Sequence, residues 1–148
     1  MRKLIAIVPL LVLALTLNAE TAREKIEGDI LTAYRELGFY DGSSMNMDWM
    51  LHVTVSAKEP YNIYIYFRKN MPQRRYIEAI ILGVATVGKV TGKIKEKTFT
   101  VWFSIWDADH KTFRRFATIL AYNCRKFLTL KTEEERKAFL KECLIFYE

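Results

Sequence analysis

The chain has 148 residues, 51% of them hydrophobic, and a formal net charge of +6. This length suits one domain with a sizeable core, and the apolar content excludes an intrinsically disordered chain. The excess of 23 Lys and Arg over 17 Asp and Glu lies mostly in residues 58–126, which hold 14 basic and 5 acidic residues. Such a stretch favours an anionic partner, unless these cations form the solvated faces of helices and turns.

Residues 1–19 predict a signal peptide or an N-terminal membrane anchor. Arg2 and Lys3 precede an uncharged, mostly apolar run of 14 residues, 4–17. As a helix this run would be about 21 Å long, shorter than the roughly 30 Å hydrocarbon core of a bilayer. A short apolar segment behind two positive charges is typical of an export signal. We therefore expect residues 20–148 to form a single domain outside the cytoplasm; a cytosolic protein with a buried first helix is the alternative.

Residues 20–38 predict an amphipathic helix, because apolar residues recur every three or four positions and Gly38 is a typical C-cap. The segments 49–56 and 61–68 then alternate with period two, and the turn residues between them predict a β-hairpin. Pairing of same-face residues gives its expected register. The expected pairs are Val55 with Tyr61, Val53 with Ile63, and His52 with Tyr64.

Residues 83–90 read GVATVGKV and differ from the phosphate-binding pattern G-x-x-x-x-G-K-[ST] only at Val90. A nucleotide site needs a helix that starts at the Lys of this pattern, Lys89. A helix starting there is not expected, because Gly92 follows Gly88 closely and a strand begins near residue 99. The spacing predicts instead a helix from Pro72 to Val90 whose glycines approach the sheet or another helix closely. A strand over 77–87 is the alternative.

The remaining elements are a strand over 99–106 and helices over 110–128 and 132–146. Thr132 and Glu135 have the spacing of a capping box at the start of the last helix. The predicted fold class is therefore α+β, with an N-terminal helix, a small antiparallel three- or four-stranded sheet with an inserted helix, and two C-terminal helices.

The one tight cluster of catalytic residue types is Asp107, Asp109 and His110. An Asp could orient the His as a general base, which would suit a small hydrolase. The alternative is helix capping, because Asp is a favoured N-cap residue. With only two His and two Cys in the chain, the sequence predicts neither a metal site nor a cofactor.

The second face of the predicted strands is rich in aromatic side chains and is the predicted binding surface. Its members are Tyr64, Tyr66, Trp102, Trp106 and His52. The alternative is that a helix covers them. The sequence leaves several partners open: a protein, a lipid, a small ligand or a second copy of the chain. It also leaves open membrane attachment through residues 4–17, and it does not favour nucleic acid.

Cys124 and Cys143 would pair in an oxidising compartment, although two antiparallel helices would hold them about 9 Å apart along the axis. Two free buried thiols are the alternative. Taken together, the sequence favours a non-enzymatic binding or assembly domain. A small hydrolase using Asp107, Asp109 and His110 is one rival, and a peripheral module whose basic stretch 68–97 contacts anionic lipid headgroups is another.

Overall fold

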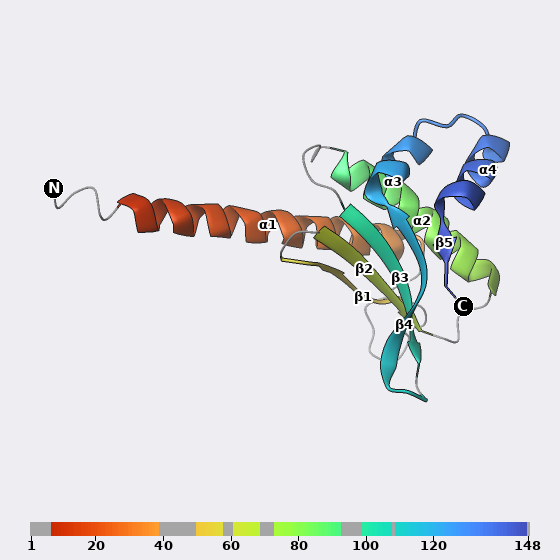
Figure 1. The fold of residues 1–148 in the computed structure, drawn as a ribbon, viewed down its shortest axis with the longest axis horizontal. Coiled ribbons are helices and arrows are strands. Elements are labelled where there is room, and N and C mark those ends of the chain that lie inside the picture. Colours follow the sequence, from red (N-terminus) through yellow and green to blue (C-terminus); the bar gives the residue numbers. More distant parts are fainter. Residues whose placement is uncertain are drawn as a thin grey trace.

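A computed structural model describes residues 7–38, 50–57, 61–68, 73–92, 99–107 and 109–147. These residues form one five-stranded mixed sheet and four helices, an α+β fold (Figure 1). The helices are α1 (Ile7–Glu36), α2 (Gln73–Thr91), α3 (Ala121–Phe127) and α4 (Glu133–Cys143). The strands, in spatial order, are β1 (Met50–Val55), β2 (Tyr61–Arg68), β3 (Phe99–Asp107), β4 (Thr112–Leu120) and β5 (Ile145–Phe146).

Helix α1 contains most of the helix predicted over 20–38 and begins earlier, at Ile7. Its first part projects away from the rest of the molecule (Figure 1), and its last part is packed into the core through Ile26, Ile30 and Tyr34. Gly38 follows with a φ of 74°, as expected of a C-cap. Among the described helices, none is both long enough and apolar enough to cross a bilayer.

The hairpin of β1 and β2 is confirmed, but its predicted register is wrong by two residues. Val55 pairs with Ile63, and Val53 pairs with Ile65. The cause lies at the end of the hairpin. The Ser56 amide donates to the Asn62 carbonyl oxygen, and the Asn62 amide donates to the Ser56 hydroxyl oxygen. Ser56 thus faces Asn62, and the partner of each β1 residue is two positions later in β2 than predicted. Because a shift of two keeps every side chain on its face, the apolar face is still the one predicted.

The prediction of a purely antiparallel sheet of three or four strands is wrong. Strands β2 and β3 are parallel, with Ile63 beside Val101 and Tyr64 beside Trp102. Helix α2 connects them and runs back along the sheet, so that β3 starts at the same end as β2. The fold is thus two antiparallel hairpins joined side by side through one helical crossover.

The predicted helix over 110–128 is also wrong, because its first part is strand β4, paired with β3. The apolar spacing that indicated a helix has another cause. A β-bulge between Arg115 and Ala117 lets Phe116 and Ala117 both face the core, which breaks the period of two. Helix α3 takes only residues 121–127.

The last predicted helix, 132–146, is α4 followed by β5. The capping box is present: the Thr132 hydroxyl accepts from the Glu135 amide at 3.1 Å, and the Glu135 carboxylate accepts from the Thr132 amide at 3.0 Å. The helix ends at Cys143, and the next residues add a two-residue strand to β4. Residues 145–146 are therefore a strand at the sheet edge.

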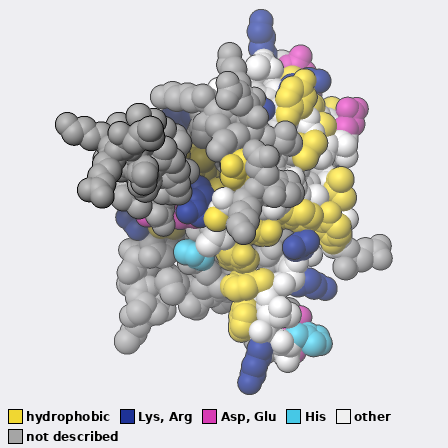
Figure 2. Space-filling view, turned by 60° about the vertical axis from the view of Figure 1, so that its left-hand side comes forward, with side chains coloured by type: hydrophobic (Ala, Val, Ile, Leu, Met, Phe, Trp, Pro, Cys, Tyr) yellow, Lys and Arg dark blue, Asp and Glu magenta, His cyan; other side chains and the backbone are white. Residues whose placement is uncertain are grey.

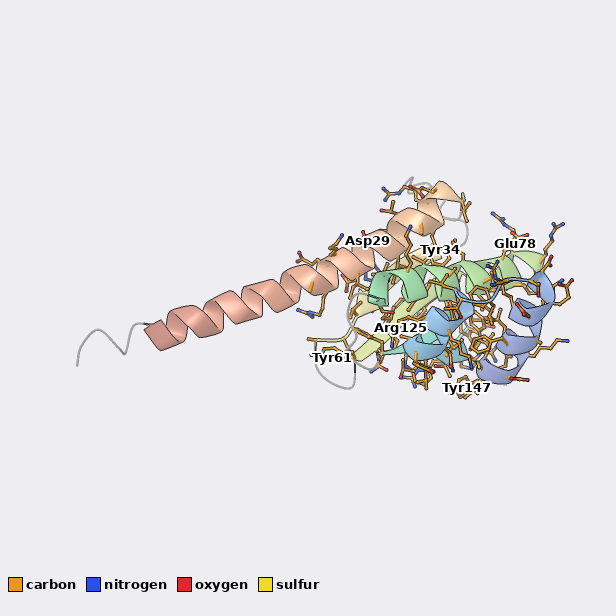
Figure 3. All side chains as sticks on the ribbon, turned by 90° about the horizontal axis from the view of Figure 1, so that it is seen from above. Asp29, Tyr34, Tyr61, Glu78, Arg125 and Tyr147 are labelled. Atoms are coloured by element: carbon orange, nitrogen blue, oxygen red, sulfur yellow. The ribbon has the colours of Figure 1, made fainter. Side chains whose placement is uncertain are left out.

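Helix α2 contains the GVATVGKV segment, and the alternative of a strand over 77–87 is wrong. A Cβ atom at Gly83 would lie 2.5 Å from the Tyr34 hydroxyl and 2.6 Å from Phe103, and one at Gly88 would clash with the carbonyl group of Cys124. The two glycines thus let α2 approach α1, the sheet and α3 closely, as the sequence predicted. In Figure 3, Tyr34 lies where α1 and α2 meet.

Candidate functional site

The two faces of the sheet differ in composition and in cover. The inner face carries buried apolar side chains, and α1 and α2 pack over it (Figure 1). Its largest buried members are Ile63, Ile65, Phe67, Val101, Phe103 and Ile119. The other face, here called the outer face, has no described helix over it.

The outer face holds all five residues of the predicted binding surface. The strand register places Tyr64 beside Trp102, and His52 opposite Tyr66. The rings of His52, Tyr66 and Tyr64 follow one another with centroids 6.3 and 6.1 Å apart and planes within 13°. Trp106 lies farther along β3, on the same face as Tyr64 and Trp102.

Three further side chains on this face were missed by the sequence analysis: Phe113, Arg115 and Tyr147. The Phe113 ring lies 4.4 Å from Tyr66 and 5.0 Å from Trp106 between centroids, so it joins their rings into one cluster. Phe113 and Arg115 were missed because residues 110–128 were assigned to a helix. The β-branched and aromatic residues of 112–119 were the signal that could have identified the strand.

Trp102 contacts three side chains, which come from β2, β4 and the end of the chain. Its indole N–H donates to the Asn62 side chain at 2.8 Å, and the Arg115 guanidinium lies 4.3 Å from the ring centroid. Tyr147 is its third neighbour, with a centroid distance of 6.0 Å. A guanidinium over an indole is a favourable cation–π pair. Arg115 therefore places a positive charge on an aromatic surface.

Each outer-face aromatic is partly exposed, with 40% of Phe113 and 44% of Tyr147 accessible. Figure 2 shows hydrophobic side chains in a band on the described surface, with Lys and Arg side chains beside them. The register assigns no acidic side chain to the described part of the outer face. The surface thus combines aromatic rings with positive charge.

No protein-family model, curated protein or solved structure matches this chain. The chemistry of its own side chains is therefore the basis for assigning a function.

The cluster of Asp107, Asp109 and His110 forms the turn between β3 and β4, and its interpretation as a helix cap is wrong. One Asp107 oxygen accepts from the amides of Asp109 and His110, and the other lies 3.0 Å from the His110 ring nitrogen Nδ1. These hydrogen bonds from His110 lower the pKa of Asp107. The cluster therefore stabilises a tight turn in which Lys111 has a φ of 49°.

The structure does not bring His52 to this turn. His52 is on β1 and the turn follows β3, and strands β1 and β4 are three spacings apart, or about 14 Å. Asp48, the other side chain that could have approached His110 to complete an acid–base set, lies outside the described residues. His110 is 77% exposed, and no group of three or more His, Cys, Asp and Glu side chains suited to a metal occurs in the described ranges.

Cys124 and Cys143 are free thiols, and only Cys124 is fully buried. Burial raises the pKa of Cys124 to about 12, and the nearby Arg125 lowers it by less. A thiol with that pKa is almost wholly protonated at neutral pH and is a poor nucleophile. Cys124 is therefore a packing residue beside Gly88.

Replacing Lys89 with alanine is expected to change the free energy of unfolding by less than about 0.5 kcal/mol, because Lys89 is exposed near the end of α2. Urea denaturation of the two proteins measures this difference. Since GVATVGKV lies within a helix, ATP should bind neither protein in a calorimetric titration. ATP binding that is lost in Lys89→Ala would instead revive the phosphate-loop interpretation.

Proposed function

We propose that this protein is a non-enzymatic binding domain that acts outside the cytoplasm, secreted or attached to the membrane by its N-terminal segment. Its ligand-binding surface is the outer face of the sheet. One observation carries the proposal: six Phe, Tyr and Trp rings and His52 gather on a face that no described helix covers. Partly exposed aromatic surfaces of this kind are characteristic of binding sites.

The rings contribute to binding in two ways. Each buries a large apolar area when a ligand covers it, and it does so with few rotatable bonds to restrict. The contacts among the rings support this role, because Phe113 already packs against Tyr66 and Trp106 in the structure without a ligand. A surface that is ordered in advance loses less conformational entropy on binding.

The charges of the outer face favour a ligand with anionic groups. Among the described side chains of that face, the basic ones are Arg115 and His52, and no acidic side chain lies beside them. A carboxylate or another anionic group on the ligand would complete the hydrogen bonding of the Arg115 guanidinium. A partner that offers both apolar or planar groups and anions therefore fits best.

Both rival functions have less support. A hydrolase would need Asp107 and His110 to act on a bound substrate, whereas Asp107 accepts hydrogen bonds from the amides of its own turn and His110 is 77% exposed. A lipid-headgroup module would need free cations on the stretch 68–97. Among the described side chains of that stretch, Arg74 and Arg75 both form ion pairs with Glu78, and Lys89 is the remaining exposed cation, whereas recognition of anionic lipid typically takes a cluster of about 4–8 cations.

The test uses defined probes of three classes with the isotope-labelled protein: acidic peptides, neutral and acidic oligosaccharides, and vesicles of phosphatidylcholine with phosphatidylglycerol. We expect one class to shift the amide resonances of β2 and β3. Tyr64→Ala and Trp106→Ala should each weaken that binding by at least about tenfold, or about 1.4 kcal/mol. Tyr122→Ala, which removes an aromatic that is 64% exposed on α3, is the matched control.

The proposal fails if every probe leaves β2 and β3 unshifted, or if Tyr122→Ala weakens binding as much as Tyr64→Ala does. Binding restricted to the anionic vesicles, and unaffected by Tyr64→Ala, would favour the lipid-headgroup alternative. Hydrolysis of a phosphoester or carboxylester that is lost in His110→Ala would favour the enzyme.

A further inference from the structure

Strand β4 is only half covered on its outer edge. Strand β5 pairs with Ala117 and Thr118, and the Tyr147 amide donates to the Phe116 carbonyl oxygen at 3.0 Å. Among the described residues, no strand lies beside the first part of β4, Thr112–Arg115, on the side away from β3. The β3–β4 hairpin extends past the neighbouring strands at the bottom of Figure 1. This part of β4, here called the free edge, is about 13 Å long.

The free edge is exposed and basic. All four of its residues are exposed, as is the preceding Lys111. Residues 111–115 contain Lys111, Arg114 and Arg115 and no acidic side chain. Because neighbouring residues of a strand point to opposite faces, Phe113 and Arg115 belong to the outer face and Arg114 to the inner side. A cation therefore lies on each side of this edge.

We propose that the free edge binds an extended acidic segment of another protein, which adds a strand to the sheet beside β4. The inference rests on the proposed function, because Phe113 and Arg115 belong both to the free edge and to the outer face. It names the class of partner that this part of the sheet binds. Backbone groups of the added strand pair with β4, and its side chains alternate between the two faces. Those on the outer face contact Phe113 and Arg115, and those on the inner side place carboxylates beside Arg114.

A second copy of the chain fits this edge less well than an acidic segment does. Two β4 edges paired across a two-fold axis would bring Arg114 and Arg115 of both copies together. Like charges placed opposite one another destabilise a strand pair, whereas opposite charges stabilise it. An acidic segment neutralises the same side chains.

Charged residues on an edge can also serve to prevent pairing with other chains. That role and the proposed one predict different results with an acidic strand. An edge that is only protective rejects every added strand, whereas the proposed edge selects by charge.

The experiment uses the synthetic peptide Glu-Val-Glu-Phe-Glu-Val with a fluorescent label, whose alternation puts carboxylates on one face and apolar groups on the other. We expect a rise in anisotropy on binding and amide shifts at residues 112–115. Arg114→Glu should weaken binding by at least about tenfold, while Arg114→Lys should stay within about threefold of the natural protein. Lys141→Glu, which makes the same charge change at an exposed position on α4, is the matched control.

Two modified peptides complete the design. Replacing every Glu by Lys tests the charge, and replacing the central Phe by Pro removes a backbone N–H that an added strand needs. Both should bind at least about tenfold more weakly. Circular dichroism confirms that each protein variant is folded.

Equal binding of the Glu and Lys peptides, absence of binding at about 1 mM, or self-association of the protein through residues 112–115 would each overturn the inference. The added-strand inference and the outer-face proposal can be contradicted separately, because Arg114 does not lie on the outer face. Binding that survives Arg114→Glu and is lost in Tyr64→Ala would reject the added strand and retain the outer-face ligand site.

Discussion

Replacing Tyr34 with alanine is expected to lower the free energy of unfolding by about 3–5 kcal/mol, the usual cost of removing a large buried aromatic ring. The side chain is fully buried, its ring contacts Phe67, and its hydroxyl donates a hydrogen bond of 2.6 Å to the Ala79 carbonyl oxygen. Together with Ile26 and Ile30, it packs α1 into the core of the domain. Since small domains are stable by about 5–15 kcal/mol, this loss is a large part of the total.

Urea denaturation measures the effect, and two further substitutions separate its causes. Tyr34→Phe keeps the ring and removes the hydrogen bond, for a loss of about 0.5–1.5 kcal/mol. Leu37→Ala removes a side chain of the same region that is 58% exposed, and it should change stability by less than about 0.5 kcal/mol. A Tyr34→Ala protein as stable as the Leu37→Ala protein would show that α1 is not part of the core.

Alanine at Gly88 and alanine at Gly28 are expected to have opposite effects. Both glycines lie inside helices, where alanine is favoured by about 1 kcal/mol. A Cβ atom at Gly28 meets nothing within 4 Å, so Gly28→Ala should stabilise the protein by up to that amount. At Gly88 the same atom clashes with the backbone of Cys124, which cannot move without shifting α3.

The clash at Gly88 should exceed the helical gain, because overpacking in a core typically costs about 1–3 kcal/mol. We expect a larger loss for Gly88→Val, whose branched side chain adds two more atoms at the same contact. Thermal and urea unfolding of the three variants give the comparison. Equal effects of alanine at positions 28 and 88 would contradict the close packing of α2 on α3.

Sequence periodicity predicted the elements that bury one continuous face. The helix over 72–90, the strand over 99–106 and the capping box at Thr132 are all present in the structure. The helix and the strand have a regular apolar spacing, and the capping box is a local hydrogen-bond pattern. Both kinds of signal are independent of distant parts of the chain. The grouping of Tyr64, Tyr66 and Trp102 on one face followed from the same alternation.

Three features depend on tertiary contacts and were therefore not predicted from the sequence: strand β4, the parallel pairing of β2 with β3, and the hairpin register. The bulge at Phe116 gives strand β4 an apolar spacing like that of a helix, so a helix was predicted there. For that reason Phe113 and Arg115 were not included in the predicted binding surface. The parallel pairing of β2 with β3 depends on where α2 returns the chain, which no local spacing encodes. The hairpin register depended on the bonds between Ser56 and Asn62, and a count of turn residues missed them.

The helical crossover between the two hairpins also has a kinetic consequence. Each hairpin joins residues that are close in sequence, and such hairpins form in about 1–10 μs. The pairing of Tyr61 with Phe99 instead closes a long stretch of chain, and contacts of that kind slow folding. We therefore expect the rate of folding to be set by the docking of one hairpin on the other, with α2 packed closely on β3 and α3 at its two glycines. Until that step is complete, the inner edges of β2 and β3 are open to pairing with other chains.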